Sequence, residues 1–200
     1  LVLGAVIAVW LVRPEWVFAS VEGQPNLLAD LALVPHDRLP LLAVGWTLIH
    51  ELYFYLAFAL LLLLPRGLFP SGLLGWLLLV AGANAWLLAL DVPVGPLLGL
   101  LTHPLTLEFG VGAFVGLLAC RGYRPAPRLL LLAGCVGLLF GAGAWAGNPP
   151  GLFENDWLRT LILGPAWAAI VWGAVGMEVD EGQGAPRVLV GLGDASYALY

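Results

Sequence analysis

Residues 41–64 read LLAVGWTLIHELYFYLAFALLLLL, an apolar run that carries His50 and Glu51 side by side among aromatic residues. About 20 apolar residues are enough for a helix to cross a bilayer. An ionisable side chain inside such a helix costs roughly 2.5 to 3.5 kcal/mol on insertion scales, and its default interpretation is functional. We therefore expect other parts of the chain to provide hydrogen-bond or ionic partners for His50 and Glu51.

The composition is that of a membrane protein. Hydrophobic residues make up 61% of the 200 residues, charged residues make up 10%, and the mean hydropathy is +0.95. The net charge is −5, and the eight basic residues, all arginines, form no basic run, which excludes nucleic-acid binding. Cys120 and Cys135 lack metal-ligand spacing, so neither a metal site nor a disulfide framework is expected.

The apolar segments predict an all-α fold, a polytopic transmembrane helix bundle. Pro104 lies inside one segment, where it removes a hydrogen bond from a helix interior. It is expected to start a new helix over residues 104–119, with Thr102 and His103 at the cap and a broken or re-entrant piece before it. About six full or partial spanning segments are expected, at residues 1–12, 41–64, 71–90, 96–119, 129–146 and 158–176. A truncated C-terminal helix is expected from Val188, and residues 26–34 are expected on the surface.

The chain begins and ends inside apolar segments, so residues 1–200 are expected to form a single membrane domain that is incomplete at both ends. Arginines in alternate loops predict its orientation, because cytoplasmic loops carry an excess of them. Five arginines fall on the expected cytoplasmic side, Arg66, Arg121, Arg124, Arg128 and Arg187, against three on the other. Glycine pairs spaced four apart, which favour close helix contacts, occur at Gly112/Gly116, Gly137/Gly141 and Gly143/Gly147.

With this orientation, polar residues on three segments lie at one depth, in the outer half of the membrane. An unpaired polar group in hydrocarbon costs several kcal/mol, so these side chains are expected to face one another across a cavity that holds a polar substrate. The layer consists of His50, Glu51, Asn84, His103 and Glu108. Residues four apart share a helix face, so Glu51 lies over Thr47 and Tyr55, and His50 lies over Trp46 and Phe54.

Each of these features also has a structural interpretation. Glu51 and Glu108 would then each pair with a hydroxyl or an arginine of a neighbouring helix, and His50 would be a satisfied interface histidine. The three-arginine loop, Arg121, Arg124 and Arg128, would be the positive-inside signal alone rather than a phosphate-binding cluster. Tryptophans near segment ends are typical of the interfacial belt.

Residues 46–56, WTLIHELYFYL, resemble a W-[ST]-L-x-x-E-x-x-F/Y-Y-L stretch of the acyltransferase 3 family of bacterial multi-spanning membrane proteins. Residues 107–112, LEFGVG, look like the family's E-F-x-x-G segment, and residues 192–200, LGDASYALY, look like its L-G-x-x-S-Y-x-L-Y stretch. The three motifs occur in the family's order, and the chain looks most like the exopolysaccharide-production branch.

The resemblance implies transfer of an acyl group, often acetyl, from acyl-CoA to a hydroxyl of a cell-surface or exopolysaccharide sugar, at the bacterial cytoplasmic (inner) membrane. It implies acyl-CoA as a co-substrate with no bound cofactor, and membrane lipid and a polysaccharide or lipid-linked sugar as partners. Family members carry an Arg and a catalytic His in earlier helices, so this fragment alone is expected to be inactive. The candidate residues are Glu51 and His50 for catalysis, with Glu51 orienting or deprotonating a partner; Trp46, Thr47, Tyr55, Asn84 and Glu108 for substrate binding; and Arg121, Arg124 and Arg128 for the CoA phosphates.

Two other classes of function remain open. A transporter or flippase for lipid-linked sugars would also need intramembrane carboxylates, broken helices and aromatic rims. A non-catalytic membrane subunit of a polysaccharide synthase would tolerate neutral replacements of Glu51 and Glu108. A serine hydrolase is poorly supported, because the chain has no G-x-S-x-G elbow.

Overall fold

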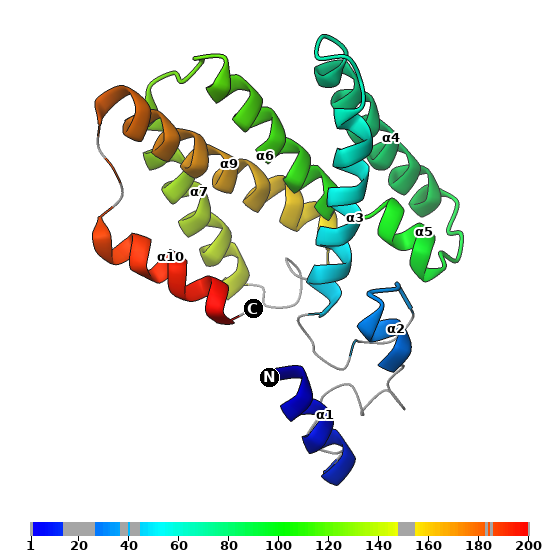
Figure 1. The fold of residues 1–200 in the computed structure, drawn as a ribbon. Coiled ribbons are helices and arrows are strands. Elements are labelled where there is room, and N and C mark those ends of the chain that lie inside the picture. Colours follow the sequence, from blue (N-terminus) through cyan, green and yellow to red (C-terminus); the bar gives the residue numbers. More distant parts are fainter. Residues whose placement is uncertain are drawn as a thin grey trace. The chain divides into compact units, whose positions relative to one another are not determined.

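The computed structural model describes residues 2–13, 27–36, 40, 45–147, 155–182, 184 and 186–199, and all regular structure among them is helical (Figure 1). The chain divides into two compact units, Leu1–Thr106 and Leu107–Tyr200. The first unit holds α1 (Val2–Val12), α2 (Leu27–Leu31), α3 (Gly45–Leu62), α4 (Phe69–Ala89), α5 (Pro96–Leu101) and the start of α6 (Leu105–Cys120). The second holds the rest of α6, with α7 (Pro127–Gly147), α9 (Asp156–Glu181) and α10 (Arg187–Leu199).

The predicted membrane helix bundle is confirmed. Among the described residues, four helical segments are long and apolar enough to cross a membrane: Gly45–Leu62, Phe69–Ala89, Pro96–Cys120 and Asp156–Asp180. Helix α7 is a shorter apolar helix over Pro127–Gly143. Many of the leucines on these helices point outward, as Leu60 and Leu79 do at 67% and 70% exposure, which suits a surface whose solvent is lipid.

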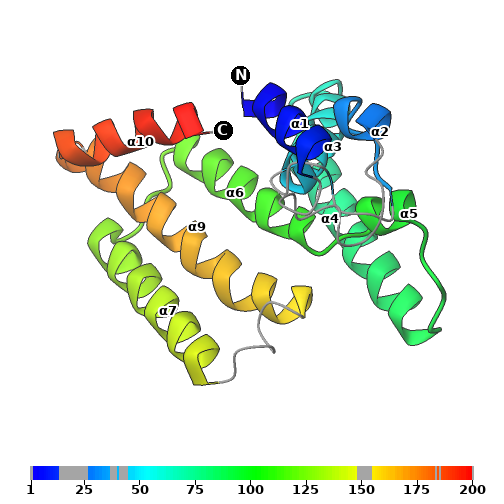
Figure 2. The same ribbon diagram turned by 90° about the horizontal axis from the view of Figure 1, so that it is seen from below.

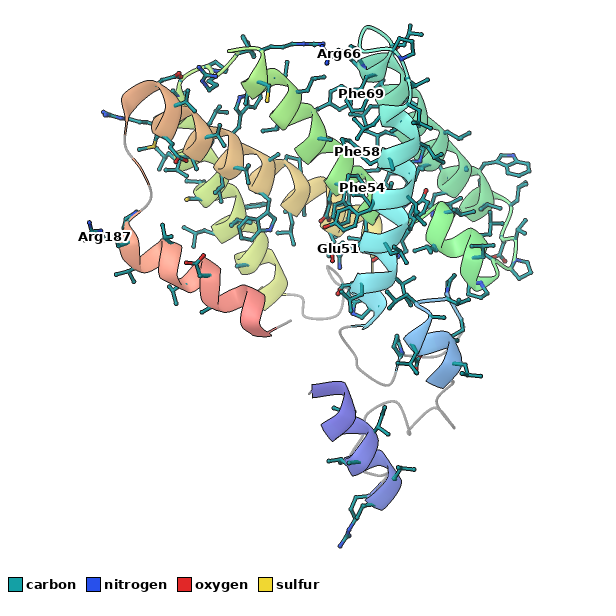
Figure 3. All side chains as sticks on the ribbon, in the orientation of Figure 1. Glu51, Phe54, Phe58, Arg66, Phe69 and Arg187 are labelled. Atoms are coloured by element: carbon teal, nitrogen blue, oxygen red, sulfur yellow. The ribbon has the colours of Figure 1, made fainter. Side chains whose placement is uncertain are left out.

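Aromatic side chains join α3 to α4 in the first unit. Phe54 and Phe58 stack on one face of α3 with ring centroids 5.4 Å apart, and Phe58 meets Phe69 edge-on at 5.5 Å (Figure 3). Trp76 of α4 lies 6.0 Å from Phe54, between ring centroids. These contacts hold the aromatic half of α3 in place, one turn beyond Glu51.

The helix between residues 96 and 120 is broken where Pro104 predicted. In a continuous helix the Leu105 N–H would bond to the Leu101 carbonyl. Here the Leu101 carbonyl instead accepts a hydrogen bond from the Tyr53 hydroxyl at 3.1 Å, and the Leu105 N–H donates to His103 Nδ1 at 3.3 Å. Side chains thus satisfy both backbone groups that the break separates, and His103 acts as the N-cap of α6.

Glycines bring α7 and α9 together in the second unit. A Cβ on Gly134 would lie 2.6 Å from the Ala166 carbonyl oxygen, and one on Gly173 would lie 2.6 Å from the Leu131 nitrogen, so only glycine allows this approach. Gly137 and Gly141 of the predicted pair also face α9. In both Figure 1 and Figure 2, α9 lies between α6 and α7.

Several predicted boundaries differ from the structure. Helix α3 begins at Gly45, and residues 41–44 of the predicted span lie outside the described residues. Residues 26–34 contain the five-residue helix α2, which is too short to span a membrane, in line with the expected surface position. Helix α9 runs past its predicted 158–176 at both ends, because the Asn155 side chain caps its start and Gly182, with φ of 66°, ends it.

Candidate functional site

His50 lies half-buried on α3, and its hydrogen bond defines its neutral tautomer. Its Nδ1 is 2.9 Å from the Trp46 carbonyl oxygen, one turn earlier. A carbonyl oxygen only accepts hydrogen bonds, so Nδ1 carries the proton and Nε2 carries the lone pair. Nε2 is buried. The Trp46 ring lies edge-on to the imidazole, with centroids 5.6 Å apart. His50 is therefore an imidazole fixed by its Nδ1–H, and its unprotonated nitrogen is buried.

His103 has the opposite tautomer. Its Nδ1 receives the Leu105 N–H, and a backbone N–H only donates, so Nδ1 carries the lone pair and Nε2 carries the proton. The two imidazole rings are in edge-to-face contact, with centroids 4.6 Å apart and planes at 82°. An imidazole with its lone pair on Nε2, on α3, and one with its proton on Nε2, at the start of α6, are thereby in contact within the first unit.

The carboxylate of Glu51 has a partner on its own helix. The Tyr55 hydroxyl donates to Glu51 Oε1 at 2.6 Å, as their spacing of four residues predicted (Figure 3 shows Glu51). Tyr55 is 57% exposed and Glu51 is half-buried. Thr47 and Asn84 are half-buried on α3 and α4 respectively. Both residues are on α3, so this hydrogen bond does not hold two helices together.

Glu108 lies in the second unit and is bonded across helices. Its Oε1 accepts a hydrogen bond from the buried Thr160 hydroxyl at 3.3 Å and lies 3.9 Å from Arg159 Nε. A Cβ on Gly164 would lie 3.4 Å from the Glu108 Cγ, so glycine gives the side chain room. This pairing with a hydroxyl and an arginine of α9 is the one that the structural alternative expected for Glu108.

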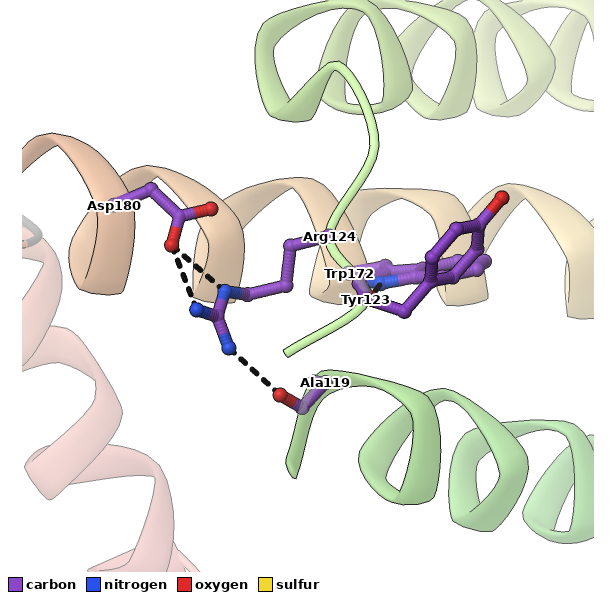
Figure 4. Close-up of polar contacts among 5 residues, drawn as sticks. All are labelled: Ala119, Tyr123, Arg124, Trp172 and Asp180. Carbon is purple, nitrogen blue, oxygen red and sulfur yellow. Dashed lines mark hydrogen bonds and ion pairs between the residues drawn. The ribbon is translucent and has the colours of Figure 1, made fainter. Parts of the chain in front are cut away.

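Arg124 of the three-arginine loop makes an ion pair and hydrogen bonds within the second unit. Arg124 Nε donates to Asp180 Oδ1 at 2.9 Å, its Nη2 lies 2.8 Å from the same oxygen, and its Nη1 donates to the Ala119 carbonyl at 2.7 Å (Figure 4). The hydrogen bond to Asp180 raises the pKa of the Arg124 guanidinium. Beside it, Trp172 donates to the Tyr123 carbonyl. Arg124 is thus part of the fold. Arg121 and Arg128 are exposed.

Of the predicted polar layer, the contact between His50 and His103 is observed. Glu51 follows His50 on α3 and Glu108 belongs to the other unit, so the layer that joins Glu51 to Glu108 stays a prediction. Tyr53, Arg159 and Thr160 were not among the predicted site residues, and His103 was predicted only as a member of the polar layer. For His103 and Tyr53 a signal existed, because the Pro104 break had to leave backbone groups that side chains would satisfy. Thr160 and Arg159 gave no signal, since their pairing with Glu108 depends on helix packing.

The described residues contain no group of three or more His, Cys, Asp or Glu side chains placed to hold a metal ion. No known protein family, curated protein or solved structure matched the chain. The placement of His50 and His103 is compatible with acid–base chemistry in a helical membrane protein.

Proposed function

We propose that this chain is part of a membrane-embedded O-acyltransferase of bacterial membranes, which moves an acyl group, in the first instance acetyl, from acyl-CoA to a sugar hydroxyl of a cell-surface polysaccharide. The observation that carries the proposal is the His50 imidazole on a membrane-length helix: its Nδ1–H is bound by the Trp46 carbonyl, so its buried Nε2 carries the lone pair. Transfer to a hydroxyl needs such a base, because an alcohol is a weak nucleophile until its proton is removed.

In the proposed reaction the sugar oxygen attacks the thioester carbonyl carbon while His50 Nε2 accepts the hydroxyl proton. The carbon–sulfur bond then breaks, and the CoA thiolate leaves and takes that proton from the imidazolium. An alcohol and a thioester thereby become an ester and a thiol. Glu51 accepts hydrogen bonds but does not attack; with the Tyr55 hydroxyl beside it, it orients the acceptor or a further proton-accepting group.

Other residues of the chain suit the two substrates. Trp46 offers an aromatic ring at the edge of His50 on which a sugar ring can stack, and it is 38% exposed. Arg121 and Arg128 are exposed arginines that can bind CoA phosphates, which Arg recognises with two parallel hydrogen bonds. Arg124 already bonds Asp180 and the Ala119 carbonyl, so its contribution to phosphate binding stays a prediction.

The test uses the full-length protein in sealed vesicles, with radiolabelled acetyl-CoA and, separately, a radiolabelled lipid-linked sugar. An acyltransferase consumes acetyl-CoA, releases CoA thiol, and leaves label on the sugar that mild alkali removes. His50→Gln should abolish this transfer while the protein still inserts. Movement of the sugar across the vesicle membrane without acetyl-CoA would instead establish a carrier. If neither ester formation nor sugar movement is observed, the remaining class is a non-catalytic subunit.

A further inference from the structure

We propose that Arg159, near the start of α9, binds the phosphate of a lipid, either the headgroup phosphate of a membrane lipid or the phosphate that joins a sugar to its carrier lipid. Both sources present the same chemistry, a phosphate anion at the membrane surface. The observation that carries the inference is a guanidinium on a side chain only 16% exposed, which donates no hydrogen bond to any residue that the structure describes. The inference does not depend on acyl transfer.

Two arginines of the second unit show the difference between a committed guanidinium and an available one. Arg124 has Nε at 2.9 Å and Nη2 at 2.8 Å from Asp180 Oδ1, and Nη1 at 2.7 Å from the Ala119 carbonyl. Arg159 instead has Nε 3.9 Å from Glu108 Oε1, which is beyond hydrogen-bond distance. An arginine carries five N–H donors, so those of Arg159 remain available to a ligand.

The guanidinium of Arg159 also reaches the molecular surface. Among the residues whose placement is described, His50 Nε2 is the side-chain nitrogen or oxygen that is both fully buried and without a hydrogen-bond partner. The Arg159 nitrogens make no hydrogen bond either, so they are not fully buried. The two Nη groups of a guanidinium lie along one edge and match two oxygens of a phosphate. A phosphate can therefore bind there without displacing a hydrogen bond of the protein.

The position of Arg159 along α9 places it at the depth of lipid phosphates. Helix α9 has 26 residues, and at 1.5 Å per residue it is about 39 Å long, longer than the roughly 30 Å hydrocarbon core of a bilayer. Arg159 is three residues after Asp156, the first residue of the helix, so it lies roughly 5 Å from that end. Arginines near the ends of spanning helices extend their guanidinium groups to the interface.

The arginine count predicts which leaflet this is. Glu108 is in the first turn of α6 and accepts a hydrogen bond from Thr160, so α6 and α9 begin at the same end of the second unit. The ion pair between Arg124 and Asp180 lies at the opposite end, which the count predicts to be cytoplasmic. Arg159 is then expected among the phosphates of the outer leaflet.

The test measures the melting temperature of the full-length protein in detergent as lipid is added, with probes matched in pairs. Phosphatidic acid is compared with diacylglycerol of the same chains, and polyprenyl phosphate with polyprenol. The phosphate lipids should raise the melting temperature of the wild type, because a ligand that binds the folded state stabilises it, and the phosphate-free lipids should not. A tighter apparent Kd for polyprenyl phosphate identifies a carrier lipid as the source. An equal or tighter value for phosphatidic acid identifies the headgroup.

Arg159→Gln should weaken phosphate-lipid binding by roughly 10- to 100-fold, as expected when charged hydrogen bonds are lost. Glu108→Gln is the matched control, since it breaks the same ion pair but keeps the guanidinium and removes a competing negative charge. It should bind phosphate lipid as well as the wild type or more tightly. Each variant is compared with its own lipid-free melting temperature, so a change in stability does not affect the comparison.

Three results would overturn the inference. Arg159→Gln might bind phosphate lipid as the wild type does, Glu108→Gln might weaken binding as much as Arg159→Gln, or the phosphate-free lipids might stabilise the wild type equally. The first and third would show that no phosphate is held by Arg159, and the second would show that the ion pair acts only through the fold. None of the three bears on ester formation, which is measured separately.

Discussion

Two intramembrane carboxylates of this chain have different surroundings, and the difference separates a candidate reactive group from a structural one. The hydrogen bond of Glu51 is to Tyr55, four residues along its own helix, whereas Glu108 is bonded to Thr160 and near Arg159 of α9. The bond within α3 adds little to helix association. The bonds to α9 help to hold two helices of the second unit together. Replacing each carboxylate by its amide should therefore have distinct consequences.

Glu51→Gln should abolish polysaccharide acylation in the full-length protein and leave its insertion and thermal stability unchanged. Gln is close in size and can still accept a hydrogen bond from Tyr55, but it can neither hold a negative charge nor accept a proton. The measurement is alkali-labile acyl label on polysaccharide, with protein amount in the membrane as the control. Retained acylation would remove Glu51 from the catalytic set.

Glu108→Gln should lower stability. The amide keeps an oxygen for the Thr160 hydroxyl but loses the charge that faces Arg159, a change worth about 1 kcal/mol for a partly exposed pair. A lower melting temperature in detergent would show it. Arg159→Gln is the matched variant: if the pair matters, the double variant should be about as stable as either single one. Additive losses would mean that the two residues act independently.

At the scale of helices, side chains bond the free backbone groups on both sides of the break between α5 and α6. Pro104 cannot donate a backbone hydrogen bond, and the Leu101 carbonyl and Leu105 N–H on either side of it bond to Tyr53 and His103. Tyr53 therefore ties α3 to the end of α5. The same break places His103 against His50, so the geometry of the candidate site depends on it.

Tyr53→Phe should destabilise the protein by about 1 kcal/mol, because the Leu101 carbonyl loses the hydrogen bond that joins α3 to α5. Tyr55→Phe is the control: it removes an identical hydroxyl from the same helix, but one that is exposed and bonded within α3. Thermal unfolding of both variants in one detergent is the measurement. Equal losses would contradict a special role of the break.

The α7–α9 contact gives a second test at this scale. In Gly134→Ala the new Cβ would meet the Ala166 carbonyl oxygen at 2.6 Å, so the helices must separate and the melting temperature should fall. Gly143→Ala on the same helix meets nothing within 4 Å, and it should be neutral or stabilising by up to about 1 kcal/mol through helix propensity. The contrast between the two variants is the measurement, and similar melting temperatures would contradict the close contact.

For the whole molecule, the sequence predicted most of what depends on local chemistry. Length and hydropathy located the spans, and Pro104 located the break. Glycine spacing was less informative: Gly137 and Gly141 contact α9, whereas Gly112, Gly116 and Gly143 have nothing within 4 Å of a built Cβ. Spacing shows which residues share a helix face but not which face meets another helix. For the same reason the pairing of Arg124 with Asp180, 56 residues apart, was beyond sequence reasoning.

That ion pair bears on how the chain crosses the membrane. It joins residues 121–126 to the end of α9, so within the second unit the loop before α7 and the chain after α9 lie at one end (Figure 4). The arginine count predicts that this end is cytoplasmic, together with Arg66, and that the loop with Asp91 is on the other side. Arg38, one of the three arginines on the opposite side, lies outside the described residues.

Single cysteines can test this topology once Cys120 and Cys135 have been replaced by alanine. Pro125→Cys and Gly184→Cys flank the ion pair, and Val92→Cys lies in the loop with Asp91; all three positions are exposed. In right-side-out vesicles a membrane-impermeant maleimide should label Val92→Cys at once, and the other two only after permeabilisation, because an apolar helix separates the two sides. The cysteine-free protein controls for background. Different labelling of Pro125→Cys and Gly184→Cys would contradict the shared end that Arg124 and Asp180 define, whereas a common reversal of all three would leave the fold intact and invert its orientation.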